Sequence, residues 1–288
     1  MPGPGMPCLG LPRLVIASVV VGWLALAPVP ASAATNDEDT APRWEAGLGV
    51  SAISFPAYRG SRQQVTYALP IPYFVYRSDR LSVDRDGARG LLYARGPLEV
   101  DLSFDGAIPV DSDDNGPRAG MDDLDPVIEL GPSLNWMLTA DRRWQLRLPV
   151  RAAIAIDGFS TRQQGWTAHP QIRYVGQAPP GGWNLNVTFG PIFATREFHA
   201  FYYDVGGDDV IADERPAFRS SGGYSGTSLQ LGISRRSGRL WFGSFVRYEH
   251  LGGAAFVDSP LVETETAVTA GLGIAWVFRE STERVHRR

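Results

Sequence analysis

Cysteine is almost missing from this sequence. The chain has 288 residues and a single cysteine, Cys8, which precedes the apolar core of an N-terminal segment with the features of an export signal. A lipidated cysteine would follow that core instead. Once the segment is removed no thiol remains, which excludes disulfides, cysteine-based metal sites and cysteine catalysis from the mature protein.

Excess positive charge is also missing. Arginine and lysine together number 27 against 31 acidic residues, so the formal net charge is −4 at pH 7. Proteins that bind nucleic acid through its phosphates usually carry a strongly basic face. The composition therefore predicts no nucleic-acid partner.

No apolar run is long enough to be a transmembrane helix. The run from Leu14 to Ala27 is shorter than the roughly 20 residues that a bilayer-spanning helix needs. It follows a positive residue, Arg13, and precedes two prolines and a small-x-small cleavage site that ends at Ala33. We expect residues 1–33 to be a cleaved signal peptide, which leaves a mature protein that is either soluble outside the cytoplasm or a β-barrel.

Apolar and polar residues alternate with period two along most of the remaining chain. From Leu98 to Asp105, for example, apolar side chains alternate with acidic or hydroxyl side chains. This alternation is typical of strands with one apolar and one polar face. Several segments are longer than the roughly 9 to 11 residues of a tilted transmembrane strand, whereas strands of globular proteins usually have about 5 or 6. The length favours a barrel.

The lengths of the connections support that choice. Twelve strands place all the short connections on one side and all the long ones on the other, as in bacterial outer-membrane barrels. Reading 80–95 as one strand would leave eleven and break this sorting. We expect an all-β fold, an antiparallel transmembrane β-barrel of about twelve strands over residues 44–278, flanked by a periplasmic arm (34–43) and a periplasmic tail (279–288). The expected strands are 44–53, 64–77, 80–86, 88–95, 97–108, 127–140, 143–157, 164–177, 181–195, 224–236, 238–252 and 265–278.

Aromatic residues gather at the strand ends on the side of the short connections. Rings at one level form the girdle that anchors a barrel in the interface of the membrane. The pattern thus also predicts contact with outer-membrane lipid. The eight expected girdle residues are Trp44, Tyr76, Trp144, Tyr174, Trp183, Trp241, Trp276 and Phe278.

Charged residues fall on the expected inward face of the strands. They could line a pore and select solutes, or they could form a network of ion pairs that fills and stiffens a narrow barrel. The second interpretation is favoured, because twelve strands lie between small filled barrels and wide porins. The residues are Glu99, Asp101, Asp105, Glu129, Arg147, Arg151, Arg173 and Arg247.

An acidic segment in a long outer connection resembles half of a calcium-binding loop. Its candidate ligands are Asp111, Asp113, Asn115 and Asp122. No helices flank it, and Pro117 stands where a backbone carbonyl should bind, so a solvated acidic loop is favoured. We expect no metal and no other cofactor.

One histidine could take part in catalysis at the outer rim. His199 lies in the long connection 196–223 together with Asp204, Asp208 and Asp209, and an acid–histidine pair is a common catalytic unit. No G-x-S-x-G motif surrounds it. A solvated loop histidine is favoured, and we expect the protein not to be an enzyme.

Several stretches together resemble one known family. They are Gly47 to Gly49 with Pro56 to Ser61 and Leu69 to Tyr73, then Asp111 to Pro126 continuing to Pro132, then Tyr248 to Gly253 with Asp258 to Val262, and the closing strand to Phe278. The sequence is similar in these places to the MltA-interacting protein (MipA)/OmpV family of outer-membrane proteins, over essentially all of the mature chain. One departure is the tail after Phe278, because outer-membrane barrels typically end on an aromatic residue.

The resemblance implies a location in the outer membrane and a non-enzymatic role. Family members are described as scaffolds that bridge a lytic murein transglycosylase and a bifunctional murein synthase, and others as porin-like. We therefore expect a structural and interaction protein, plausibly a scaffold for periplasmic murein-remodelling enzymes. The alternatives are a small-solute channel and, less favoured, an outer-rim barrel enzyme. Because the periplasmic connections are short, a scaffold would have to use 34–43, 279–288 and the rims of the turns.

Overall fold

The computed structural model describes residues 40–78, 81–84, 87–107, 112, 116–178 and 182–286. The expected signal peptide and the first part of the expected arm lie outside these residues. The chain divides into two units, Met1–Glu38 and Asp39–Arg288, and every described residue belongs to the second.

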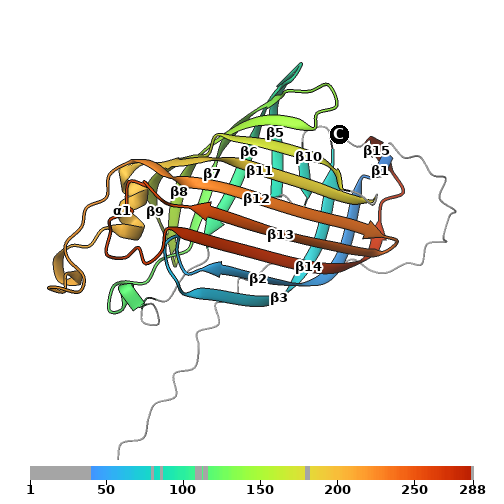
Figure 1. The fold of residues 1–288 in the computed structure, drawn as a ribbon. Coiled ribbons are helices and arrows are strands. Elements are labelled where there is room, and N and C mark those ends of the chain that lie inside the picture. Colours follow the sequence, from blue (N-terminus) through green and yellow to red (C-terminus); the bar gives the residue numbers. More distant parts are fainter. Residues whose placement is uncertain are drawn as a thin grey trace, which may run out of the picture. The chain divides into compact units, whose positions relative to one another are not determined.

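The described residues form one large antiparallel sheet that closes on itself (Figure 1). The order of its strands is β10-β11-β12-β13-β14-β2-β3-β4-β5-β6-β7-β8-β9, and β8 and β9 pair in turn with β10 and β11. A sheet closed in this way is a barrel. Its strands are β2 (Trp44–Pro56), β3 (Gln64–Arg77), β4 (Leu81–Asp84), β5 (Gly87–Arg95), β6 (Leu98–Ala107), β7 (Val127–Met137), β8 (Trp144–Asp157), β9 (Ser160–Ala168), β10 (Gln171–Ala178), β11 (Trp183–Ala194), β12 (Gly223–Ser237), β13 (Leu240–His250) and β14 (Thr266–Glu280).

The expected barrel of about twelve strands is confirmed, with one strand broken in two. β9 and β10 follow one another along β8, β9 pairing with the outer part of β8 and β10 with the part near Trp144. The break falls at His169-Pro170, because proline has no N–H to donate to a neighbouring strand. The region 80–95 forms two strands, β4 and β5, which pair with each other.

Buried and exposed side chains alternate along strands such as β7 and β13. On β7, Ser133 and Asn135 are buried, whereas Leu134 and Trp136 between and beside them are exposed. The exposed apolar side chains make up the outward face, which matches the lipid-facing band of an outer-membrane barrel. Among the described residues, no helix is both long and apolar enough to cross a membrane.

Seven of the eight expected girdle residues share the outward face of their strands. Trp144 and Tyr174 pack together with their ring centroids 5.0 Å apart, and Trp276 contacts Phe278 at 6.3 Å. The other outward residues of this set are Trp44, Tyr76 and Trp183.

Trp241 does not belong to the girdle, which corrects the expectation. Its side chain is 8% exposed and packs against Tyr73, with the ring centroids 5.6 Å apart. On β13 its neighbours Leu240 and Phe242 are exposed, so Trp241 points inward. The expectation rested on its place near the end of a strand and ignored which face it occupies.

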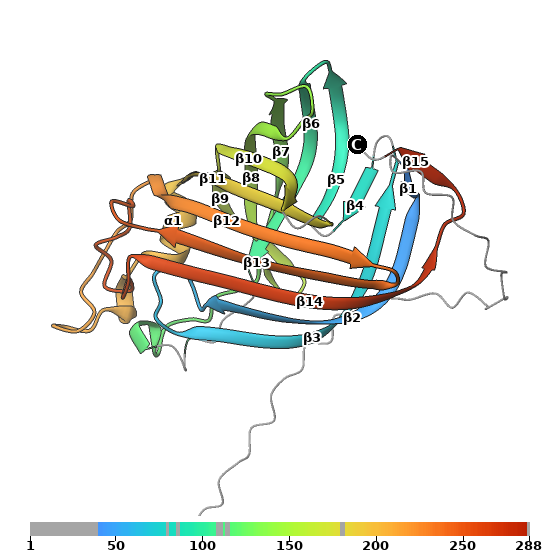
Figure 2. The same ribbon diagram turned by 45° about the vertical axis from the view of Figure 1, so that its right-hand side comes forward.

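A second, small sheet joins the two ends of the described chain. β1 (Thr40–Pro42) pairs antiparallel with β15 (Arg284–His286), and the two strands lie beside the short-turn end of the barrel (Figure 2). We call this pair the terminal sheet. The described outer connections also contain a helix, α1 (Arg196–Tyr203), and two short 3-10 turns, η1 (Gly116–Arg118) and η2 (Gly207–Asp209).

Candidate functional site

The four long connections, at the end of the barrel opposite the short turns, fold into one packed unit, which we call the outer cap. It comprises the described residues of 57–63, 112–126, 195–222 and 251–265. Its centre is the stack of Tyr203 on Phe256, with ring centroids 3.7 Å apart and planes 2° from parallel. Because one core draws on all four connections, they are not independent loops. The buried core residues are Ala57, Tyr58, Leu124, Tyr203, Val205, Leu251, Ala254, Phe256 and Leu261.

Arg59 ties the first connection of the cap to the barrel wall. Its Nε lies 2.9 Å from Glu249 Oε2, and Nη2 donates to the backbone oxygen of Ser225 at 2.6 Å. Its own carbonyl accepts a hydrogen bond of 2.8 Å from the Tyr203 hydroxyl. Charge-assisted bonds in a site this shielded from water are among the stronger hydrogen bonds of a protein.

Two buried arginines, Arg118 and Arg215, join the second and third connections. Arg118 Nη1 donates to the Tyr202 carbonyl at 3.1 Å. In the opposite direction, Arg215 Nη1 donates to the carbonyls of Pro117 and Ala119 at 2.9 and 3.0 Å. Each connection therefore supplies an arginine that donates hydrogen bonds to backbone carbonyls of the other connection.

His199, on α1, is fully buried within the cap, so the favoured expectation of a solvated loop histidine was wrong. Its Nδ1 lies 2.7 Å from the Ser221 carbonyl, and its Nε2 lies 2.9 Å from Ser225 Oγ. A carbonyl only accepts, so Nδ1 carries the proton and Nε2 accepts from the serine. The disfavoured alternative, an acid–histidine pair, is not formed with Asp204, which binds Arg196 at 2.9 Å.

Acidic pH should loosen the outer cap through His199. Burial lowers the pKa of its imidazole, so the unfolded cap binds a proton more readily than the folded cap. The stabilising contribution is present above the unfolded pKa of about 6.5 and is lost as the pH falls towards the folded value. Amide hydrogen exchange in residues 196–222 should accelerate at pH 5.0 relative to a His199→Gln variant measured at the same pH. If the ratio of the exchange rate of the full chain to that of His199→Gln is the same at pH 7.5 and at pH 5.0, this role of His199 is contradicted.

The inward acids lie close to one of the expected arginines. Arg151 Nη1 is 3.3 Å from Asp105 Oδ2 and 3.9 Å from Glu129 Oε2, and Arg151 Nε donates to Ser103 Oγ at 2.7 Å. Asp101, on the same face of β6, is buried. This group brings charges from three strands, β6, β7 and β8, into one network.

The other expected lumen residues bind polar side chains on adjacent strands or turns. Arg147 donates to Asn135 at 2.8 Å, Arg173 to Asn186 at 3.1 Å and Arg247 to Gln230 at 2.9 Å. Glu99 pairs with Arg142, a turn residue that the strand pattern did not single out. These contacts agree with a stiffened wall as well as with a polar lining.

Most of the candidate calcium ligands lie outside the described residues, namely Asp111, Asp113 and Asn115. The backbone carbonyl of Asp122 accepts hydrogen bonds from Ser112 Oγ at 2.9 Å and Arg118 Nη2 at 3.0 Å. In the described part of the chain, no group of three or more histidine, cysteine or acidic side chains could hold a metal ion.

At the short-turn end of the barrel, the terminal sheet is bound to the barrel wall. Arg43 Nη1 lies 2.9 Å from Glu283 Oε1, and Arg77 Nη1 donates to the Pro42 carbonyl at 2.8 Å. Arg284 Nε donates to Thr40 Oγ1 at 3.0 Å. The described residues beyond the closing strand, 281–286, are therefore folded against the barrel.

A buried carboxylate anchors the base of the terminal sheet. Glu45 is 3% exposed and binds Arg77 Nη1 at 2.8 Å, Arg236 and the Tyr73 hydroxyl. Arg236 in turn lies 2.9 Å from Glu280 Oε2, at the end of β14. This chain of ion pairs connects β2, β3, β12 and β14 next to the terminal sheet.

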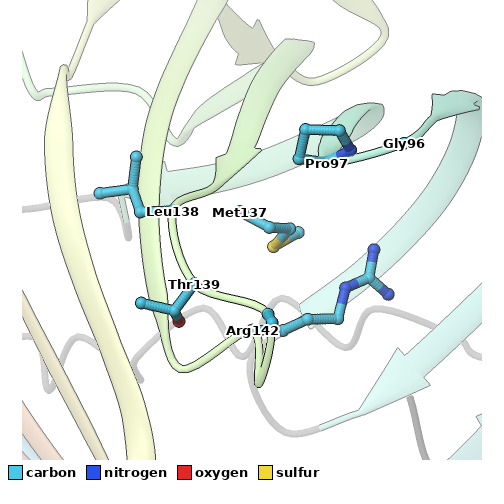
Figure 3. Close-up of a pocket in the computed structure, with 7 residues that line it drawn as sticks. Gly96, Pro97, Met137, Leu138, Thr139 and Arg142 are labelled. Atoms are coloured by element: carbon cyan, nitrogen blue, oxygen red, sulfur yellow. The ribbon is translucent and has the colours of Figure 1, made fainter.

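A pocket of about 360 Å³ opens beside two of the short turns. Figure 3 shows it between the turn after β5 and the turn after β7, with the Arg142 side chain along one side. Its lining residues are Gly96, Pro97, Met137, Leu138, Thr139, Ala140 and Arg142. The pocket and the terminal sheet occupy the same end of the barrel but come from different strands.

The family model for MltA-interacting protein MipA matches residues 48–278 of the chain. No curated protein matches this chain.

Among solved structures, the chain is similar to several outer-membrane proteins. One is the CymD monoaromatic hydrocarbon channel, with a TM-score of 0.39, 13% identity, and coverage of 83% of this chain and 89% of that one. Another is an outer-membrane channel from Pseudomonas putida F1, with a TM-score of 0.32, 14% identity, and coverage of 86% and 100%. A third is OprG from Pseudomonas aeruginosa, with a TM-score of 0.22, 11% identity, and coverage of 81% and 94%.

Proposed function

The chain belongs to the family of MltA-interacting protein MipA and is an outer-membrane protein, and on this premise we propose that it is a scaffold for murein-remodelling enzymes. Its first partner is a periplasmic lytic murein transglycosylase, which docks on the terminal sheet. The barrel then serves as the membrane anchor of an enzyme assembly and performs no chemistry itself.

The observation that carries the proposal is the folded state of the terminal sheet. β1 and β15 pair with each other, and the ion pair of Arg43 with Glu283 fastens them at their base. A short, ordered, two-stranded sheet has two edges, and an extended segment of a partner can add to such an edge through its backbone. An ordered surface also loses less conformational entropy on binding than a frayed end would.

The charge of this surface favours an acidic partner. The sequence of 279–288 is net basic, because its four arginines outnumber its two glutamates, Glu280 and Glu283. Complementary charge mainly increases the rate of encounter and the specificity of docking. A second partner, the murein synthase, would have the pocket beside Arg142 as a separate surface on the same face.

The outer cap favours the scaffold function rather than the function of an open channel. Its core packs around Tyr203 and Phe256. Two buried arginines, Arg118 and Arg215, and the partly exposed Arg59 hold the connections together. A channel alternative draws its support from the charged inward face around Arg151. Conductance across a planar bilayer distinguishes the two functions, because a capped scaffold carries no steady current.

Truncation of the terminal sheet tests the proposal. A chain that ends at Ser281 loses β15 but keeps all of β14, which ends at Glu280. We expect it to insert normally, with unchanged heat-modifiable migration, and to lose the transglycosylase that is crosslinked to the full chain in intact envelopes. A chain that ends at His286 is the matched control, because it retains β15. If the transglycosylase stays crosslinked after truncation at Ser281, the terminal sheet is not its docking surface.

A further inference from the structure

One edge of the barrel wall lacks a strand partner over most of its length. β3 pairs with β2 from Gln64 to Tyr76, but its other side pairs with β4 only at Tyr76 and Arg77. Residues 64–75 therefore present an edge that no described strand covers. In Figure 2, β5 and β6 rise away from β2 and β3 beyond the short strand β4.

The sequence of β3 is suited to an edge that stays open. Pro70 and Pro72 lie two positions apart, so their missing N–H groups fall on the same edge of the strand. Proline within a sheet is confined to edges, because it cannot donate to a neighbouring strand, and it also discourages the addition of a further strand. The wall cannot close here by regular pairing along the full strand.

The inward face beside this edge is apolar. Tyr67, Leu69 and Ile71 alternate with the prolines and share the face of the buried Tyr73. A Cβ placed on the inward Gly273 would lie 3.7 Å from Ile71 Cδ1, which confirms that this face looks into the barrel. Leu69 is nonetheless 49% exposed and Tyr67 36%.

β6, two strands beyond the short strand β4 in the sheet, has a polar inward face. On the inward side of β6, Asp101 and Ser103 are buried, and the Asp105 side chain, 42% exposed, pairs with Arg151. The barrel interior thus has an apolar wall on β3 and a charged wall on β6. Exposed apolar side chains on the inner face of a barrel are the kind of surface that marks a binding site.

We propose that the free edge of β3 is a lateral opening, through which a small amphipathic molecule passes between the outer membrane and the barrel interior. Its apolar part lies on Tyr67, Leu69 and Ile71, and its polar end faces Asp105 and Arg151. The four connections pack into one core at the end of the barrel, so we take the side of the barrel, and not its capped end, as the route. This activity is independent of the proposed scaffold role, because the opening lies in the barrel wall and the proposed docking surface is the terminal sheet.

Spin labels on single cysteines test the opening. The only cysteine, Cys8, lies in the expected signal peptide, so Leu69→Cys, Leu272→Cys and Ser234→Cys each give one labelling site in the mature protein. Leu272 faces lipid, whereas Ser234 faces inward on a strand that pairs on both sides, with Asn184 and with Gly243. In lipid nanodiscs, we expect the label at position 69 to collide with lipid-dissolved oxygen nearly as often as the label at 272. If it instead resembles the label at 234, the wall is closed and the proposal is wrong.

Binding of a fluorescent probe tests the apolar site. N-phenyl-1-naphthylamine has an aromatic body and a weakly polar amine, and its emission rises in apolar surroundings. We expect a saturable component above that of empty nanodiscs, and a Kd at least fivefold weaker for the double variant Tyr67→Ser, Leu69→Ser. Leu272→Ala controls for changes at the lipid face, and heat-modifiable migration verifies folding. Equal binding by the double variant and the full chain would overturn the assignment of the site.

Discussion

Leu272→Arg should prevent or strongly impair insertion of the barrel, whereas Gly273→Ser should not. Leu272 is 63% exposed on the outward face of β14, and an arginine on the lipid face at the midplane of a barrel costs about 2 to 4 kcal/mol. Heat-modifiable gel migration after extraction from membranes measures the folded fraction of each variant.

The neighbouring glycine is a matched control on the same strand. Gly273 points inward, and a Cβ added to it would meet its nearest atom, the Val50 carbonyl oxygen, at an ordinary 3.5 Å. Serine therefore fits without a shift of the backbone. Equal folding of the two variants would mean that the inward and outward faces of β14 are assigned the wrong way round.

Arg59→Ala should release the outer cap and turn a silent barrel into a conducting one. The substitution leaves Glu249 without its 2.9 Å partner and removes the bonds to Ser225. Removal of one member of a buried ion pair costs about 3 to 5 kcal/mol, and the partial exposure of Arg59 places the effect near the lower figure. That loss should be enough to populate open forms of the cap.

Single-channel recording in planar bilayers measures the effect. We expect no steady current from the full chain and stepwise currents from Arg59→Ala. Arg62→Ala, in the same connection, is the control, because the Arg62 side chain is exposed and its removal leaves the cap core intact. Steady conductance of the unmodified protein would favour the channel function over the scaffold.

The strands could be predicted because each one carries its own pattern. Alternation and length are local properties, and the sorting of short and long connections supplied the number of strands and their direction. The break at Pro170 is visible in the sequence, although the continuous alternation on both sides concealed it. The inward position of Trp241 could also have been found, because it has the same parity on β13 as Arg247.

The outer cap could not be predicted, because its contacts join residues far apart in the chain. Arg59 and Glu249 are 190 residues apart, and Tyr58 reaches the carbonyl of Leu261 across 203. Connections that pack into a cap contain the same types of polar residue as solvated loops, so composition does not distinguish them. His199 shows the difficulty, since nothing near it in the sequence indicates that Ser225 and Phe256 will enclose it.

The terminal sheet was beyond prediction for a related reason. β1 and β15 have three residues each, too few to show a period. Their pairing depends on the closure of the barrel, which brings Trp44 and Glu280 to the same end and places Arg43 opposite Glu283. The sequence could name these two segments as the material available to a scaffold, but not their pairing.

Site-specific photocrosslinking in intact envelopes tests the scaffold role most directly. A benzophenone amino acid is placed either at Thr282, which is exposed next to the terminal sheet, or at Ile211, which is exposed in the outer cap. The scaffold account predicts that a lytic murein transglycosylase is crosslinked from position 282 and not from position 211. No transglycosylase at position 282, in a chain whose insertion is normal, would contradict it.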